Sequence, residues 1–232
     1  VRSRGLGDVY KRQIHMYKDS PEDLVYDLSS YAAWGDTPMG RTILGTYESL
    51  DGITPDIMRN YMNNHYTSAN TIISVSGNFD DTFFELLEKY FGTKKMLDTK
   101  PYLPDAPYIS KNNIVKEKDI EQVQLVATFK GIDVMDESVY SLLVFNNVFG
   151  SGMSSRLFQN IREQRGLVYS ISAGHSAYIN TGVFDISAGM SPESLGEVAH
   201  LISKEINTIK RNKLTSAEIT KAKEQLKGNY IL

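Results

Sequence analysis

Two hydrophobic periods alternate along the chain and predict an α+β fold, in which helices pack on a mainly antiparallel sheet. Apolar residues recur every three or four positions in the segments that we expect to be helical: 20–35, 54–61, 80–91, 138–149, 154–164, 191–209 and 215–232. Short β-branched or alternating runs, which are typical of strands, fall at 71–77, 123–129, 167–177 and 182–189. Helices and strands are therefore expected in both halves of the chain.

Capping and turn residues mark the ends of several of these elements. Ser20-Pro21 and Thr54-Pro55 each place a capping hydroxyl before a proline, which favours the first turn of a helix. Thr215-Ser216-Ala217-Glu218 has the spacing of a capping box before the last helix. Asn180-Thr181-Gly182 is a turn sequence, so the last two predicted strands are expected to pair as a hairpin.

The same patterns indicate two domains. Residues 1–13 are basic, contain glycine and follow neither period, so we interpret them as a non-native leader. Residues 96–113 contain three prolines and lack periodicity, which is typical of a linker. We therefore predict a first domain at 14–95 and a second at 114–232. The last helix has no stop signal, so the second domain is expected to be cut short at its C-terminus.

Composition narrows the possible functions. The 232 residues carry a net charge of −3, which gives no electrostatic case for binding nucleic acid. The absence of cysteine excludes disulfides, thiolate metal ligands and a thiol nucleophile, and it fits a cytoplasmic location. No run reaches the roughly 18 apolar residues that span a bilayer, so no membrane partner is expected.

Arg162 and Tyr169 flank a predicted junction between a helix and a strand. The pattern places an arginine at the helix end, a glycine stop at Gly166 and a tyrosine at the strand start. A guanidinium offers several hydrogen-bond donors, and a phenol donates without ionising near neutral pH. The pattern alone leaves two simpler interpretations open: a surface arginine that pairs with an acid, and a strand tyrosine in the core.

Three collinear blocks resemble the pitrilysin / insulinase / mitochondrial-processing-peptidase family of zinc metallopeptidases. They are the blocks at 14–23, at 38–49 with Ile53-Thr54, His65-Tyr66 and Ser76-Gly77-Asn78, and at 154–169 with Gly182 and Phe184. The resemblance implies two homologous domains that close over an unfolded peptide. It implies that Arg162 and Tyr169 bind a substrate carbonyl and stabilise the oxyanion of the tetrahedral intermediate.

The zinc motif of that family, H-x-x-E-H, is missing. The four histidines, His15, His65, His175 and His200, are too far apart in sequence to form it. The resemblance places the third metal ligand, a glutamate, where this chain has Gln13, and a neutral amide is a poor substitute for a carboxylate. The first domain is therefore expected to be incomplete, and the chain is expected to bind no zinc.

The resemblance leads to one functional hypothesis and one alternative. The chain is expected to be part of a zinc-dependent metalloendopeptidase, supplying the substrate-binding Arg162 and Tyr169 but not the zinc site. As given, it should bind peptide weakly and cleave nothing. The alternative is a non-catalytic family member that acts as partner or scaffold for an active sister subunit. An unpaired sheet edge in the first domain also predicts dimers or aggregates.

Overall fold

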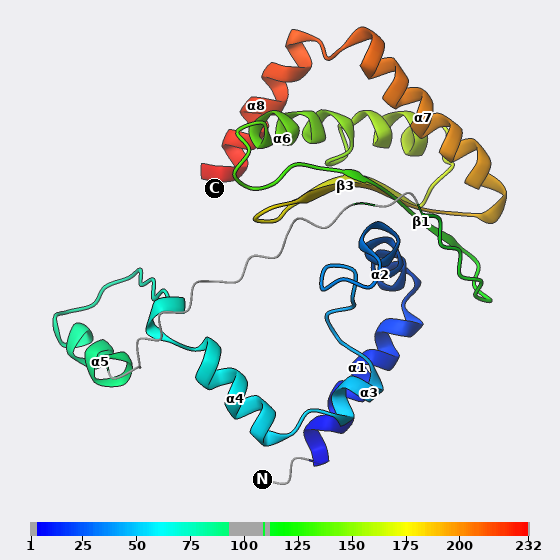
Figure 1. The fold of residues 1–232 in the computed structure, drawn as a ribbon. Coiled ribbons are helices and arrows are strands. Elements are labelled where there is room, and N and C mark those ends of the chain that lie inside the picture. Colours follow the sequence, from blue (N-terminus) through cyan, green and yellow to red (C-terminus); the bar gives the residue numbers. More distant parts are fainter. Residues whose placement is uncertain (1–3, 93–108, 110–111, 232) are drawn as a thin grey trace. The chain divides into compact units, whose positions relative to one another are not determined.

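The computed structural model describes residues 4–92, 109 and 112–231 (Figure 1). The chain divides into two compact units, and each is described by itself. Unit 1 consists of Val1–Lys11 with Leu44–Pro104, and unit 2 consists of Arg12–Ile43 with Asp105–Leu232. Residues 14–43, which we predict to lie in the first domain, thus cluster with the second half of the chain.

Unit 2 contains a three-stranded antiparallel sheet. Its strands are β1 (Val123–Lys130), β2 (Ser170–Ala177) and β3 (Gly182–Met190), in the order β1-β3-β2. The predicted hairpin of β2 and β3 is confirmed, with Ala173 opposite Ile186. Because β3 is the central strand, its side chains are mostly buried, whereas β2 alternates between buried and exposed.

Three helices cover one face of this sheet, as Figure 1 shows: α6 (Val139–Phe149), α7 (Leu195–Asn212) and α8 (Ser216–Ile231). The short 3₁₀ turn η3 (Pro192–Ser194) leads into α7. The core lies between these helices and the sheet, and its fully buried members include Phe149, Leu157, Ile161, Ile186, Met190 and Val198. This core fixes the segment that joins α6 to β2.

Helix α2 (Pro21–Trp34) packs against β1. The Thr128 hydroxyl contacts the Ser29 hydroxyl at 2.5 Å and donates to Asp185 at 2.6 Å. Burial raises the pKa of Asp185, and the bond from Thr128 opposes that shift. Trp34 packs edge-on against Tyr178, with ring centroids 5.8 Å apart. A polar chain and an aromatic contact therefore attach α2 to the sheet.

Unit 1 is helical in its described part and has little core. It contains α3 (Tyr47–Asp51), α4 (Pro55–His65), the 3₁₀ turn η1 (Ser68–Asn70) and α5 (Thr82–Phe91), while α1 (Arg4–Asp19) runs through both units. Thr67 is the only buried residue among those whose burial is described in unit 1. Apolar side chains such as Met58 and Ile72 are exposed, so no apolar interior is seen among the described residues of unit 1.

Most of the sequence-based predictions are confirmed, and three are corrected. The α+β class is confirmed, as is the capping box of α8, in which Thr215 and Glu218 exchange hydrogen bonds. The strand predicted at 71–77 is absent, because no described segment pairs with it. Residues 4–13, predicted to lack a period, belong to α1. Residues 38–52, whose proline and three glycines predict a loop, contain α3. Most of the predicted linker lies outside the described residues.

Candidate functional site

The junction between α6 and β2 contains a rare helical form. The chain is helical from Arg156, and residues 158–163 form a π-helix, η2 (Phe158–Glu163). The N–H of Gln164 donates to the carbonyl of Gln159, five residues earlier, at 3.1 Å. Most π-helices are single turns, and they occur frequently at functional sites. The helix predicted at 154–164 is thus present but wider than an α-helix.

The inner side of this segment is part of the core. Leu157, Phe158 and Ile161 are buried, and Val168 is buried just before β2. Gly166 has φ +64°, a left-handed conformation that glycine adopts without strain and that turns the chain back toward the sheet. The packing therefore leaves the polar residues of the segment at the surface or facing α7.

Arg162 and Tyr169 both lie on the exposed side. Arg162 is in the last turn of η2, with its guanidinium carbon 4.8 Å from the centroid of the Phe158 ring. Tyr169 immediately precedes β2, is 59% exposed and donates its backbone N–H to the carbonyl of Gly189 at 2.8 Å. Within the described residues, neither polar side-chain group has a hydrogen bond or ion pair.

These positions contradict the simpler interpretations of both residues. Arg162 forms no ion pair with any acid in the part of the chain that the structure describes. Tyr169 is not a core residue. An exposed guanidinium and an exposed phenol that form no hydrogen bond or ion pair with described side chains are chemically able to donate hydrogen bonds to a carbonyl or an oxyanion.

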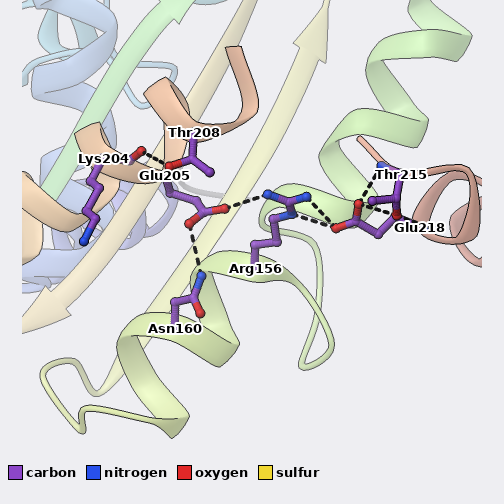
Figure 2. A network of polar contacts seen from close by, with 7 residues as sticks. All are labelled: Arg156, Asn160, Lys204, Glu205, Thr208, Thr215 and Glu218. Carbon is purple, nitrogen blue, oxygen red and sulfur yellow. Dashed lines mark hydrogen bonds and ion pairs between the residues drawn. The ribbon is translucent and has the colours of Figure 1, made fainter. Parts of the chain in front are cut away.

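Arg156, in contrast, is fully engaged (Figure 2). Its Nη1 contacts Glu205 of α7 at 3.0 Å, and its Nε and Nη2 contact Glu218 of α8 at 2.7 Å. Asn160 of η2 donates to the other oxygen of Glu205 at 3.1 Å. The hydrogen bond from Arg156 lowers the pKa of Glu218 to about 2, and the bond to Glu218 raises the pKa of Arg156. Sequence analysis missed this network.

The histidines and acids that the structure describes do not assemble into a set that fits zinc. Gln13 lies exposed on α1, and His15 one turn from Asp19 forms an exposed ion pair with it at 2.8 Å. No group of three histidine, aspartate or glutamate side chains within the described ranges could hold a metal ion. We therefore assign no metal ligand to Gln13 or to any described histidine.

Other polar features of the sequence have structural roles. His65 packs on Tyr61 with ring centroids 4.2 Å apart, and His175 lies 3.4 Å from the carbonyl of Ile132. The Gly150-Ser151-Gly152 turn approaches β2 closely: a Cβ on Gly150 would lie 2.4 Å from that of Ala173. Gly150 is therefore required for packing of α6 on the sheet. No described helix is long and apolar enough to cross a membrane.

Comparisons with known proteins identify close relatives. Residues 52–226 match the family described as the peptidase M16 inactive domain. The chain is 39% identical over 225 residues to the zinc protease YmxG of Bacillus subtilis, covering 97% of this chain and 55% of that protein. It is 34% identical over 226 residues to a zinc protease of Rickettsia felis, with 97% and 54% covered. The chain thus spans about half the length of these curated relatives.

Solved structures share the fold. The peptidase M16 inactive domain from Pseudomonas fluorescens has a TM-score of 0.83 at 21% identity, covering 97% of this chain and 55% of that one. A chain of complex III2 from Candida albicans, with Inz-5 bound, has a TM-score of 0.86 at 18% identity, covering 100% and 57%. At these identities the likeness establishes the fold alone.

Proposed function

We propose that this chain, which belongs to the peptidase M16 family, forms the substrate-binding side of a zinc-dependent endopeptidase. The observation that carries the proposal is the pair of exposed donors at Arg162 and Tyr169, in and after a π-helix, which form no hydrogen bond or ion pair within the described part of the chain. The Bacillus and Rickettsia relatives carry the name zinc protease, and this name supports the reaction class. The proposed substrate is an unfolded peptide.

In this proposal, Arg162 and Tyr169 donate hydrogen bonds to a peptide carbonyl. The guanidinium carries several N–H donors and the phenol carries one O–H donor. Donors already in place when negative charge develops on the carbonyl oxygen stabilise the transition state, and one such donor is worth about 2.7–4 kcal/mol in other enzymes. We assign zinc to a part of the protease that the described residues do not supply.

A binding titration tests this proposal. An extended, fluorescently labelled peptide is titrated with the chain, and affinity is read from anisotropy. We expect Arg162→Ala to weaken binding about tenfold or more, because a charge-assisted hydrogen bond is worth about 1.5–3 kcal/mol. Arg211→Ala, at an exposed arginine of α7, is the matched control and should bind like the wild type.

Two results would count against the proposal. Equal affinities of Arg162→Ala and Arg211→Ala would remove Arg162 from the site. Zinc-dependent turnover of peptide by the chain alone, abolished by Arg162→Ala, would contradict the expectation that this chain binds without cleaving.

A second candidate function is that of a non-catalytic subunit. It is favoured by the family description, which names an inactive domain, and by the fold shared with a chain of complex III2. Such a subunit would bind an active sister chain or another copy of itself. Unimpaired complex formation with a sister protease by the Arg162→Ala Tyr169→Phe double variant, together with no peptide binding by the wild type, would favour this alternative.

A further inference from the structure

We infer that Glu205, together with Arg156 and Asn160, forms a positioning network that holds η2 against α7 and thereby fixes Arg162. The inference rests on the proposed function, because Arg162 matters only if it contacts substrate. None of the three network residues is itself proposed to touch the peptide. Their role is to act through Arg162.

A single carboxylate joins two points of the segment to α7. Oε1 of Glu205 accepts from the Arg156 guanidinium at 3.0 Å, and Oε2 accepts from the Asn160 amide at 3.1 Å (Figure 2). Arg156 begins the helical stretch, and Asn160 lies within η2, two residues before Arg162. Two anchors on one carboxylate restrict rotation of the segment about its own axis.

Burial makes these contacts effective. The Glu205 side chain is 14% exposed and that of Arg156 is 21% exposed. Hydrogen bonds between charged groups are stronger where water is partly excluded, and an unpaired partner there is costly. The backbone carbonyl of Asn160 also accepts from the Arg165 guanidinium, so Asn160 is held through both its side chain and its backbone.

The core alone does not set the orientation of Arg162. Phe158 and Ile161 anchor the inner side of η2 by apolar packing, which is non-directional. The directional contacts come from the carboxylate of Glu205. Phe158 and Arg162 both belong to η2, so their contact depends on how this segment is wound. Glu205 holds Arg156 and Asn160 at a fixed spacing, and loss of that link would let the segment rewind and move the Arg162 guanidinium away from the Phe158 ring.

Glu218 provides an internal comparison. It bonds to Arg156 and caps α8 through Thr215, but it has no contact with Asn160. Loss of Glu218 should therefore destabilise unit 2 without releasing Asn160 from α7. If the network were purely structural, every variant that lowers stability would also displace Arg162. If it positions Arg162, loss of Glu218 lowers stability without displacing Arg162.

Nuclear magnetic resonance of the Arg162 side chain tests the inference on the full chain. In the wild type, the Phe158 ring current should shift the δ-methylene and Nε–H resonances of Arg162 upfield. We expect Glu205→Gln to move these resonances most of the way to free-arginine values while the chain stays folded. Glu218→Gln should retain the shift despite losing stability, and Glu224→Gln, which breaks an exposed pair on the same helix, should change neither.

Asn160→Ala is the second variant, because it removes the link to η2 and leaves the Arg156–Glu205 ion pair in place. It should displace the Arg162 resonances as Glu205→Gln does, and it should weaken peptide binding about tenfold, as expected for loss of one positioned hydrogen bond. Unshifted Arg162 resonances in folded Glu205→Gln or Asn160→Ala would overturn the inference, as would equal displacement in Glu218→Gln. If both variants displace Arg162 but wild-type peptide affinity is indifferent to Arg162, the positioning stands and the proposed function fails.

Discussion

Arg156 and Arg162 lie six residues apart in one short segment and have opposite environments. Arg156 is partly buried between two glutamates from two different helices, whereas Arg162 is exposed and lies over an aromatic ring. The first arginine has all its strong contacts within the protein, and the second has its donors available. The difference separates an anchored side of the segment, which we expect to determine stability, from an exposed side, which we expect to determine binding.

The largest effect should come from the core under the anchored side. Ile161 is 1% exposed, so Ile161→Ala should cost about 2–5 kcal/mol of unfolding free energy through lost burial and a cavity. Arg162→Ala, one residue away, should stay within about 0.5 kcal/mol of the wild type because the site is exposed. Trp34, the only tryptophan, is buried in unit 2 and reports the transition by fluorescence during urea unfolding. A destabilisation by Arg162→Ala equal to that of Ile161→Ala would contradict the distinction between an anchored side and an exposed side of the segment.

Removing Arg156 should have the next largest effect. Arg156→Ala leaves Glu205 and Glu218 without their cation, and breaking a buried pair costs about 3–5 kcal/mol. Because these side chains are 14–28% exposed, we expect about 2–3 kcal/mol, since solvent screens part of the interaction. Arg59→Ala breaks an exposed pair with Asp56 and should change stability by less than about 1 kcal/mol. The same urea titration, followed by circular dichroism, measures both.

Acid should remove the contribution of Glu218 to the free energy of unfolding. Its pKa is lowered to about 2 in the folded chain from an ordinary value of 4.5, so its stabilisation is fully present above pH 4.5. That contribution, about 1–3 kcal/mol after allowing for partial exposure, is lost as the pH falls toward 2. Burial of Asp185 acts in the opposite sense, because it raises the pKa of that carboxyl. The ionised carboxylate destabilises the folded state at higher pH, and this cost disappears once the pH falls below the ordinary pKa of aspartate. Glu218→Gln should flatten the pH dependence of unfolding between pH 4.5 and 2; an unchanged slope would contradict this assignment.

The smallest effect on stability should come from the cap of α8. Glu218 both pairs with Arg156 and takes part in this cap, and a change at Thr215 affects the cap alone. Thr215→Ala removes the capping hydroxyl of α8 but leaves the Arg156–Glu218 pair, and a lost cap costs about 1 kcal/mol. Thr208→Ala, near the C-terminal end of α7, removes a hydroxyl that bonds back to the carbonyl of Lys204 and should be neutral or slightly stabilising. Thr215→Ala should therefore lower the melting temperature relative to the wild type, whereas Thr208→Ala should leave it unchanged or raise it slightly.

Local signals allowed much of the fold to be predicted from sequence. The strand patterns at 123–129 and 182–189, the turn at Asn180-Thr181-Gly182 and the capping box at Thr215 each act over a few residues. The two strands, the turn and the capping box are all present in the structure. The segment 71–77 has the same β-branched composition but forms no strand. A strand requires a partner to satisfy its hydrogen bonds, and no described segment supplies one.

The site was only partly predictable for a related reason. Arg162 and Tyr169 could be placed at a helix end and a strand start from one local motif, and they lie there. The Arg156 network joins residues 49 and 62 positions apart, so no local pattern indicates it. The π-helical form of η2 was also hidden, because it depends on how the segment packs on α7 and the core rather than on its helical period.

A double-mutant cycle on peptide affinity tests the central claim most directly. The dissociation constant of a labelled, extended peptide is measured for the wild type, Arg162→Ala, Tyr169→Phe and the double variant. If both side chains donate to one substrate carbonyl, each single change weakens binding and the two effects are non-additive, with a coupling of about 0.5–3 kcal/mol. Strictly additive effects would mean that the two residues do not act on the same group. Unchanged affinity in both single variants would show that the exposed side of this segment does not bind the peptide.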